Sequence, residues 1–381
     1  MNRIAVVGAS GFVGSALCER LFFEGINFAP FVRGTGNAAR VSRLGIPIRR
    51  LDLLDSKAVL DALTGFDVVV NCSLGDKAAV SRGFHNLLLA MERLRTSRLI
   101  HLSSASIYGV EPKPDCVSEE GSPDPQSNQY AEMKLRQDES IFRLSQKGVA
   151  TYILCPGAIV GPYSVFSIGL AEILRSGPMP LVDGGANPSN LVHVDNLVEA
   201  ILAAARSSSG AGERYFVNET RPVSWRTVLE DHARILGIQL EFVQVTTDEV
   251  RPFLSKGPRR ARLRDQGRVL ISPEFRRAAS KLAPIGWIND LASATFGHLP
   301  PRTQNRIRER LQWPISVNGS RPALPLSSRF VTAQVRAYYQ SPQKLTTRLG
   351  WTPPLSYEAG METIANWFEF AGMVDSRARR A

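Results

Sequence analysis

The stretch from Arg3 to Phe23 constrains the fold of this chain more than any other. It begins with an apolar run that ends at Val7, continues with glycines at positions 8, 11 and 14, and ends in helical spacing. A strand, three glycines at three-residue intervals and a helix, in this order, are typical of a loop that holds a dinucleotide at a helix N-terminus. The first glycine allows the tight turn, the second lets the backbone approach the pyrophosphate, and the third lets the helix pack closely on the strand. We therefore expect the cofactor to contact Gly8, Ser10, Gly11, Phe12, Val13 and Gly14.

Strand-like runs alternate with helical stretches along the first two thirds of the chain, which favours parallel strands with helices on both faces of one sheet. We therefore expect an α/β fold of the Rossmann type, a doubly wound parallel sheet with a smaller C-terminal lobe around the substrate. Residues 1–165 form the expected NAD(P)-binding domain, whose sheet is completed by about 190–245, and the expected substrate lobe consists of 166–189 and 246–381. The runs are Arg3–Val7, Asn27–Val32, Ile48–Leu53, Phe66–Asn71, Arg98–Leu102 and Thr151–Leu154.

The end of the second run bears on the choice of dinucleotide. An NAD site usually has an Asp or Glu there to hold the ribose 2′-hydroxyl, whereas an arginine suits the 2′-phosphate of NADP. This chain has Arg33 and no acid at that strand end. We therefore expect NADP rather than NAD, with Arg33 as a cofactor ligand. A solvated loop arginine is the alternative interpretation.

Composition excludes several other classes of protein. With 44% hydrophobic and 21% charged residues, the 381-residue chain has the balance of an ordinary globular enzyme. Its four cysteines are scattered and form neither a disulfide framework nor a metal-ligand pattern, so no metal is expected. The first strand begins at residue 3 or 4, and no apolar run approaches the length of a membrane span. The sequence therefore predicts a cytoplasmic protein.

The candidate reactive groups lie between residues 101 and 134. A strand-like run ends in Ser103, Ser104 and Ser106, and a helix opens after a polar loop with Tyr130 and Lys134. Positions four apart share one face of a helix, so the phenol and the ammonium can face one pocket. We expect Lys134 to lower the pKa of Tyr130, and a strand-end hydroxyl to hydrogen-bond a substrate oxygen while Tyr130 moves the proton. A solvated surface pair is the alternative, but of the eight tyrosines only Tyr130 has a lysine four residues on.

Together, the glycine loop and the Ser and Tyr-x-x-x-Lys pattern resemble the extended short-chain dehydrogenase/reductase family, of the NAD-dependent epimerase/dehydratase type. The resemblance implies that Ser104, Tyr130 and Lys134 are catalytic, that hydride is transferred at a secondary hydroxyl or ketone, and that Lys134 also holds the nicotinamide ribose. It covers residues 1–245 and 336–370. It further implies cofactor contacts at Asp52, Leu53, Cys72, Ser73, Tyr130, Lys134, Pro156 and Gly157. A turn residue at Asp52 and a small buried Cys72 are the structural alternatives.

Several positions depart from the family pattern. Dehydratases of the family carry Asp-Glu directly after the catalytic hydroxyl, whereas this chain has Ala105-Ser106, so we do not expect elimination of water. Many nucleotide-sugar relatives read Arg-Pro-x-Asn where this chain has Cys155 and Ala158, which leaves the diphosphate-binding Asn without an equivalent. We interpret His193, which matches a family histidine, as a structural link between a strand and a helix.

Positive charge is concentrated in one segment. The chain carries a formal net charge of +11, and residues 251–336 alone hold 17 Lys and Arg against 4 Asp and Glu. The family match is lost here, so we interpret about 246–335 as a basic insertion. It is expected to cap the substrate pocket, to hold a substrate diphosphate, or to make a peripheral contact with an anionic membrane through residues 251–336. No nucleic-acid module accompanies the charge, so nucleic acid is not an expected partner.

The first functional hypothesis is a sugar epimerase or reductase that uses NAD(P) and acts on a nucleotide- or lipid-linked sugar, as in polysaccharide biosynthesis. A hydroxysteroid- or flavonol-type ketone reductase is the alternative, and Ala158 suits it. A third hypothesis, a non-catalytic dinucleotide-sensing regulator, is disfavoured by the Tyr130–Lys134 pair. The expected partner is a small-molecule substrate, with a sugar diphosphate first. Pairing of two copies as a homodimer and a membrane-peripheral location are left open.

Overall fold

The computed structural model describes residues 3–34, 38–74, 79–94, 98–111, 118–126, 128–207, 210–254 and 324–374. Most of the basic insertion, residues 255–323, lies outside these ranges. The expectations for that segment therefore stay predictions. No helix within the described residues is long and apolar enough to cross a membrane.

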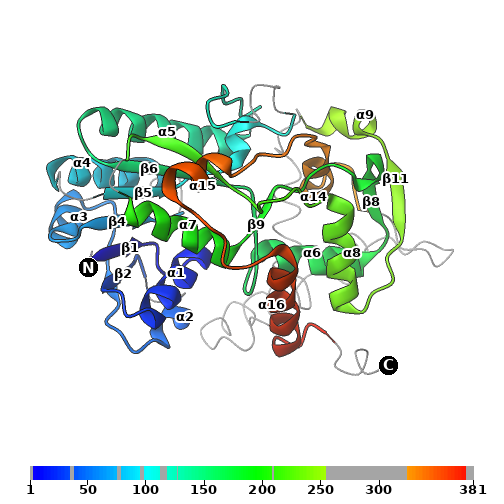
Figure 1. The fold of residues 1–381 in the computed structure, drawn as a ribbon, viewed down its shortest axis with the longest axis horizontal. Coiled ribbons are helices and arrows are strands. Elements are labelled where there is room, and N and C mark those ends of the chain that lie inside the picture. The colour runs from blue at the N-terminus through cyan, green and yellow to red at the C-terminus, as the bar shows by residue number, and fades with distance from the viewer. Residues whose placement is uncertain are drawn as a thin grey trace, which may run out of the picture.

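A parallel sheet of seven strands forms the centre of the molecule's first part (Figure 1). The strand order is β10-β6-β5-β4-β1-β2-β3, and every pairing in this sheet is parallel. The chain thus starts in the middle of the sheet, builds to one edge and then returns to build the other. This arrangement confirms the predicted doubly wound α/β fold and puts its switch point between β1 and β4. The strands are β1 (Ile4–Val7), β2 (Phe28–Val32), β3 (Arg49–Arg50), β4 (Val68–Asn71), β5 (Arg98–Leu102), β6 (Thr151–Pro156) and β10 (Glu213–Val217).

Helices cover both faces of this sheet, because side chains alternate across each strand. Ile4 and Val6 of β1 enter a core that α1 and α7 close, whereas Ala5 and Val7 enter a second core beneath α3, α4 and α5. Figure 1 shows these two groups of helices on opposite sides of the strands. The helices are α1 (Phe12–Phe23), α2 (Ala39–Ser42), α3 (Ser56–Leu63), α4 (Phe84–Leu94), α5 (Gln129–Gln146) and α7 (Val194–Arg206), with a π-helix, η2 (Ala79–Gly83), before α4 and a 3₁₀ helix, η3 (Ala105–Tyr108), after β5.

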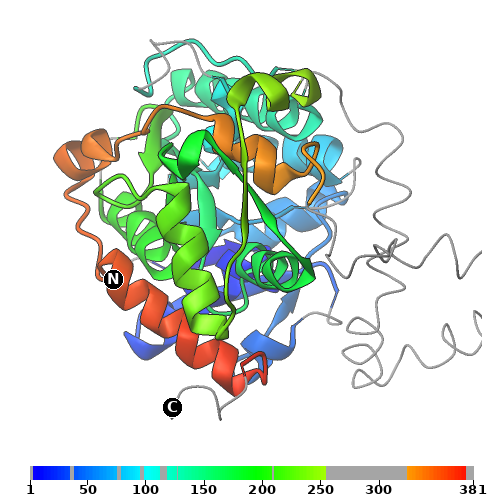
Figure 2. The same ribbon diagram turned by 90° about the vertical axis from the view of Figure 1, so that its right-hand side faces the viewer.

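A third core lies beside the sheet and is formed by segments from distant parts of the chain. Helices α6, α8 and α16 and strand β8 contribute most of its buried side chains. Figure 2 shows α8 and α16 side by side, and the two helices contact each other. The remaining elements are β7 (Ala158–Val160), α6 (Val165–Ser176), β8 (Met179–Val182), η5 (Asp183–Gly185), β9 (Leu191–His193), α8 (Trp225–Leu236), β11 (Phe242–Val245), α9 (Thr247–Val250), η6 (Arg251–Phe253), α14 (Arg329–Thr332), η7 (Ala333–Val335), α15 (Gln343–Leu349) and α16 (Tyr357–Phe370).

Two details differ from the expectations. The third strand is only Arg49–Arg50 instead of Ile48–Leu53, because it is an exposed edge strand that pairs with β2 alone. The family resemblance also implied that residues 341–353, which contain the Leu-Gly-Trp-x-Pro segment (349–353), pack the substrate lobe. Instead, Leu345 and Trp351 are buried with α1 and α7 against the sheet, and the Trp351 indole donates a 3.0 Å hydrogen bond to the Asn196 carbonyl. The C-terminal part of the chain therefore fastens onto the first part of the molecule as well as completing the third core.

Candidate active site

The glycine loop packs directly against the end of β4. Gly8 has a φ of +85°, and a Cβ at this position would lie 2.7 Å from the Ser73 backbone nitrogen. A Cβ on Gly14 would lie 2.3 Å from the Gly8 carbonyl oxygen. Both close approaches require glycine, so the turn and the start of α1 are held as the sequence predicts.

The loop fits the pyrophosphate of a dinucleotide. Gly11 is the N-cap of α1 and has no side chain to accept a hydrogen bond from the first-turn amides, which leaves these donors available to a phosphate. Ser10 and Phe12 are half-buried beside them, while Val13 is buried in the core. The three residues therefore lie at the helix start where the predicted contacts would be made.

The other predicted cofactor residues are spread around the same end of the sheet. Arg33 is exposed just after β2, and Cys72 and Ser73 follow β4 and are half-buried. Asp52 is exposed and accepts a 3.0 Å hydrogen bond from the Leu54 amide, so its carboxylate shapes a turn. Burial raises the pKa of the Cys72 thiol to about 12, which fits a small structural residue rather than a reactive thiolate. Leu53 is buried next to Gly83, whose Cβ would lie 2.8 Å from the Leu53 side chain.

Helix α5 presents Tyr130 and Lys134 at the ends of β5 and β6. Asn128 caps this helix and accepts hydrogen bonds from the Tyr130 and Ala131 amides at 3.1 and 3.3 Å. Tyr130 is 39% exposed, whereas Lys134, one turn later, is only 4% exposed. The Lys134 ammonium donates a 2.7 Å hydrogen bond to the Leu102 carbonyl, the last residue of β5. An ammonium has three donors, so two remain for other partners.

Ser104 is the hydroxyl that the structure brings close to Tyr130. The Ser104 oxygen accepts from the Ser106 amide at 3.2 Å and from the Ser106 hydroxyl at 2.9 Å, which fixes it at the start of η3. Burial raises the pKa of Tyr130 above its ordinary value, and the nearby Ser104 hydroxyl acts in the opposite direction. The expectation that Lys134 lowers this pKa is therefore wrong for this structure: Ser104 has that effect, while Lys134 is engaged by the strand carbonyl.

Beneath the pair lies a buried carboxylate, Asp138, one helical turn after Lys134. It is fully buried, accepts a 2.9 Å hydrogen bond from the Ser103 hydroxyl and forms a 2.9 Å ion pair with Arg214 of β10. Burial lowers the pKa of Lys134 to about 8, and Asp138 acts in the opposite direction. The carboxylate thus keeps the ammonium protonated near neutral pH in an apolar setting. Sequence reasoning missed Asp138, although its spacing of four from Lys134 placed it on the same helix face.

A second buried polar chain links the ends of β4 and β5. The Asn71 side-chain oxygen accepts from the Ser73 hydroxyl at 2.6 Å, and its amide nitrogen lies 3.1 Å from His101 Nδ1. Burial lowers the pKa of His101 well below its ordinary value, so the imidazole is neutral and connects β5 to β4 through Asn71.

The loop that follows β6 approaches the site from the other side. Pro156 is buried at the end of β6, and a Cβ on Gly157 would lie 1.7 Å from the Asn190 carbonyl oxygen. Only glycine fits there. Cys155 is buried and inert, because burial raises its pKa well above the ordinary value. Ala158 is half-buried at the start of β7, and its backbone amide donates a 3.0 Å hydrogen bond to the Asn190 carbonyl.

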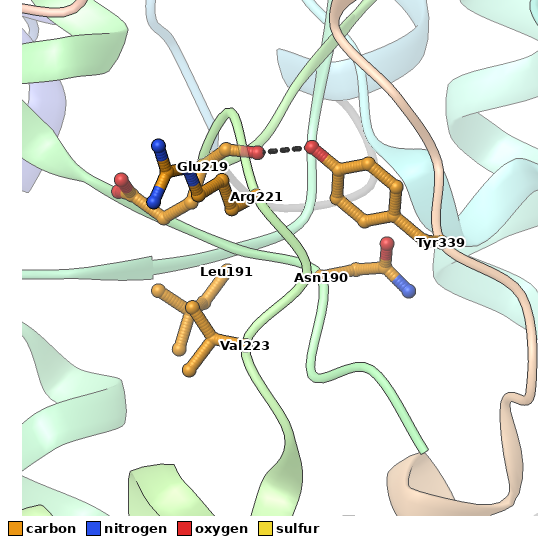
Figure 3. A pocket seen from close by; sticks show the side chains of 6 residues that line it. All are labelled: Asn190, Leu191, Glu219, Arg221, Val223 and Tyr339. Atoms are coloured by element: carbon orange, nitrogen blue, oxygen red, sulfur yellow. Dashed lines mark hydrogen bonds between the residues drawn. The ribbon is translucent and has the colours of Figure 1, made fainter. Parts of the chain in front are cut away.

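The segment after η7 packs beside the start of β9, where a shallow hollow is lined by Asn190, Leu191, Glu219, Arg221, Val223 and Tyr339 (Figure 3). The Tyr339 hydroxyl donates to the Glu219 carbonyl, and the Asn190 amide donates 2.9 Å to the Tyr338 carbonyl. His193 is also part of this junction: its Nε2 lies 2.9 Å from the Thr363 hydroxyl of α16, which agrees with a structural histidine.

The model of the NAD dependent epimerase/dehydratase family matches residues 4–217, more than half of the chain. The chain belongs to this family. The chain is therefore an oxidoreductase of the type that uses a nicotinamide dinucleotide. The family resemblance inferred from the sequence is confirmed.

Three relatives of the chain have names that differ in the reaction they specify. A 4-hydroxy-2-methyl-3-oxo-4-farnesyl-3,4-dihydroquinoline-1-oxide ketoreductase from Stigmatella aurantiaca is 28% identical over 74% of this chain and 85% of its own length. A 2-alkyl-3-oxoalkanoate reductase from Stenotrophomonas maltophilia is 28% identical over 62% of this chain and 76% of its own. An N-acetyl-alpha-D-glucosaminyl-diphospho-ditrans,octacis-undecaprenol 4-epimerase from Escherichia coli O157:H7 is 26% identical over 56% of this chain and 66% of its own.

Solved structures of the family share the fold along almost the whole chain. The UDP-glucose 4-epimerase of Thermus thermophilus, solved with NAD, is 20% identical, covers 97% of this chain and 99% of its own, and has a TM-score of 0.59. The UDP-glucuronic acid 4-epimerase of Bacillus cereus, also with NAD, is 16% identical with a TM-score of 0.62 and covers 97% of this chain and 99% of its own. At this level of identity the likeness concerns the fold alone.

Proposed function

We propose that this protein transfers hydride between NADP and a secondary alcohol or ketone, with Ser104, Tyr130 and Lys134 as its catalytic residues. The observation that most supports this proposal is the proximity of the Ser104 hydroxyl to Tyr130, whose pKa it influences, with Lys134 one turn further along the same helix. These groups lie at the carboxyl end of β5, the same end of the parallel sheet at which the glycine loop follows β1. The exposed Arg33 after β2 supports the choice of NADP, because a guanidinium matches a 2′-phosphate.

The side chains divide the work of a ketone reduction as follows. Tyr130, a neutral phenol because its pKa is raised, donates its proton to the carbonyl oxygen as hydride reaches the carbonyl carbon, Ser104 donates a hydrogen bond to the same oxygen, and solvent reprotonates the tyrosine afterwards. The nicotinamide would supply the hydride when the reduced cofactor is bound. Lys134, which donates to the Leu102 carbonyl, would hold a ribose hydroxyl of the cofactor with a remaining donor. Asp138 and Arg214 hold that helix turn in place.

An apolar ketone, rather than a nucleotide sugar, is the substrate that the site residues favour. The Asn that would contact a diphosphate is replaced by Ala158, and the neighbouring Arg by the buried Cys155. Without those two polar side chains this loop offers a sugar diphosphate only backbone groups. The ketoreductase and the oxoalkanoate reductase among the relatives have names that specify a 3-oxo group on a farnesyl- or alkyl-bearing molecule. We extend that chemistry, a ketone beside a large apolar group, to this chain.

A second candidate is epimerisation of a lipid-linked sugar, which is one form of the first hypothesis from the sequence, an epimerase or reductase of a nucleotide- or lipid-linked sugar. The similarity to the undecaprenol-linked 4-epimerase favours it. The two candidates differ in their cofactor balance. A reductase consumes one NADPH with each turnover. An epimerase returns the hydride to the opposite face of the same carbon, so the amount of reduced cofactor does not change.

The test is the substitution Tyr130→Phe in the full chain. Turnover of a secondary alcohol or ketone should fall by about 10²- to 10⁴-fold, because the general acid–base group is lost. Fluorescence titration with NADPH and NADH should give unchanged dissociation constants and also reveals which cofactor is preferred. Tyr163→Phe, which removes a hydroxyl of similar exposure outside the site, is the matched control. Full activity in Tyr130→Phe would refute the proposal.

A further inference from the structure

Helix α5 holds the end of β5 at two successive residues. Lys134 donates a 2.7 Å hydrogen bond to the last carbonyl of β5, and Asp138, one turn later, accepts a 2.9 Å hydrogen bond from the Ser103 hydroxyl. The end of the strand is therefore held at a carbonyl and at the side chain that follows it, and Ser104 is the next residue along the chain. Because Tyr130 lies one turn before Lys134, these contacts determine how the Ser104 hydroxyl and the phenol meet.

Asp138 also ties this helix to a more distant strand. The carboxylate is fully buried and forms a 2.9 Å ion pair with Arg214 of β10, which is partly buried. Strand β10 pairs with β6, and β6 pairs with β5. The chain Ser103–Asp138–Arg214 thus joins the end of β5 and helix α5 to a strand two positions away in the sheet. A shift of α5 along β5 would break buried charged hydrogen bonds, which is costly.

The Asp138 carboxylate has one oxygen more than this link uses. Its Oδ2 accepts from Ser103 and Arg214, whereas Oδ1 is buried and has no hydrogen-bond partner within the described part of the chain. Replacing a buried ion pair with apolar side chains often leaves a protein equally stable or more stable. Stability alone therefore does not account for a charge at this position, and its place beside Tyr130 and Lys134 points to a role in their chemistry.

The negative charge of Asp138 acts on both titratable groups of the candidate active site. It raises the pKa of Tyr130, as burial does, and it raises the pKa of Lys134 against the effect of burial. Arg214 opposes the rise that burial causes in the pKa of Asp138, so the carboxylate stays ionised near neutral pH. Asp138 therefore favours the protonated phenol, which is the form that ketone reduction requires.

Three more titratable groups that face Tyr130 or Lys134 are neutral near neutral pH. Cys72 follows β4 and Cys155 lies on β6, and burial raises the pKa of each thiol. His101 of β5 is neutral because burial and the Lys134 charge lower its pKa. These groups therefore leave the charge of Asp138 without compensation at the two site residues.

We propose that Ser103 and Asp138 are positioning residues of the candidate active site. Ser103 fixes the strand end that carries the Ser104 hydroxyl. The Asp138 carboxylate anchors Ser103 and keeps the proton on Tyr130 until the ketone is bound. Neither residue needs to contact the substrate, because each acts through a neighbour that does. This assignment rests on the proposed function for the identity of the reacting groups.

Two substitutions in the full chain separate the two effects. Ser103→Ala removes the anchored hydroxyl and keeps the charge, whereas Asp138→Asn removes the charge and keeps an oxygen that can accept from Ser103. Reduction of 2-decanone, a ketone with a long apolar chain, is measured with NADPH across a range of pH. In Ser103→Ala, kcat should fall about tenfold with unchanged NADPH affinity and an unchanged pH profile, because small displacements at a reacting centre are costly.

In Asp138→Asn the pH dependence itself should change. The alkaline limit of kcat/KM should move to lower pH by about one unit, because Tyr130 and Lys134 lose a charge that favours their protonated forms. A second readout needs no substrate: the ultraviolet absorbance of the Tyr130 phenolate, taken as the difference from the same protein with Tyr130→Phe, should appear at lower pH as well. Where loss of one charge unfolds the protein, Asp138→Asn combined with Arg214→Gln removes both charges and should give the same direction of shift.

Asp231→Asn is the matched control. Asp231 pairs with Arg234 at 2.5 Å and accepts a 2.9 Å hydrogen bond from the Tyr357 hydroxyl, so it has the same two kinds of partner as Asp138 but lies on α8. This variant should keep the wild-type kcat and pH profile. Thermal unfolding shows whether each variant is folded.

The outcomes separate this inference from the proposed function. A wild-type kcat in Ser103→Ala, an alkaline limit and phenolate titration that Asp138→Asn leaves in place, or equal changes in Asp231→Asn would overturn the assignment. Absence of turnover in the wild type, together with a phenolate that appears at lower pH in Asp138→Asn, would support the control of Tyr130 by Asp138 and count against the proposed reaction instead.

Discussion

At the scale of single residues, Lys134 is a buried cation whose contribution to stability depends on pH. The side chain is 4% exposed, and burial lowers its pKa to about 8 from the 10.5 of a free lysine. Between these two values the unfolded chain binds more protons than the native one, so this residue makes the native state more stable as the pH rises. Above about pH 10.5 both states are neutral and the penalty is gone, whereas below about pH 8 it is present in full.

The substitution Lys134→Met isolates this effect. The free energy of unfolding of the wild type minus that of the variant should rise by about 3 kcal/mol between pH 8 and pH 10.5, at 1.36 kcal/mol for each pKa unit. Urea unfolding at several pH values in this window measures it. The same comparison with Lys147→Met, an exposed lysine that pairs with Glu92 at 2.8 Å, is the control. A difference that stays flat with pH would show that Lys134 is not desolvated as described.

The residue scale also shows where prediction from sequence ends. The shared helix face of Tyr130 and Lys134 follows from a spacing of four and could be predicted. The pKa of Tyr130 could not, because it depends on burial and on Ser104, which a loop brings back from 26 positions earlier in the sequence. Asp138 could be predicted only in part. Its spacing of four from Lys134 places it on the same helix face, but its partner Arg214 lies 76 residues away in the sequence.

At the scale of elements, the start of α5 decides how well Tyr130 is placed. Asn128 accepts two first-turn amides, one of them from Tyr130 itself. The substitution Asn128→Ala should lower the free energy of unfolding by about 1 kcal/mol, the usual cost of losing an N-cap. It should also lower kcat by about tenfold, since frayed first-turn backbone lets the phenol move away from Ser104, and small displacements at a reacting centre are costly. Urea unfolding and steady-state kinetics measure the two effects.

The matched control for this prediction is another helix N-cap. Ser356 caps α16 through the Ala359 amide at 3.3 Å and lies outside the candidate site. Ser356→Ala should therefore lower stability by a similar amount and leave kcat unchanged. If the two variants lost turnover to the same extent, the decrease would reflect general destabilisation and not the position of Tyr130.

At the scale of the whole molecule, the sheet could be predicted and the course of the C-terminal segment could not. Local alternation of strand and helix signals is enough to indicate a doubly wound sheet, because each unit packs beside its neighbour in sequence. Arg336 meets Gly109 across 227 residues, and Gln340 meets Asn218 across 122. No local sequence pattern predicts contacts between residues so far apart in the chain. The predicted place of the Leu-Gly-Trp segment was wrong for the same reason.

The segment that contains Trp351 holds the C-terminal part of the chain against the sheet. Trp351 is 1% exposed, packs with α1 and α7, and donates to the Asn196 carbonyl. Trp351→Ala should lower the free energy of unfolding by about 3–5 kcal/mol, because it leaves both a large cavity and an unpaired buried carbonyl. Trp351→Phe keeps most of the ring and should lose less. Trp367→Ala, which removes a half-buried indole from α16, is the control. Urea unfolding followed by circular dichroism measures all three, and a loss for Trp351→Ala no larger than for Trp367→Ala would contradict the role of Trp351 as the anchor on the nucleotide-binding part.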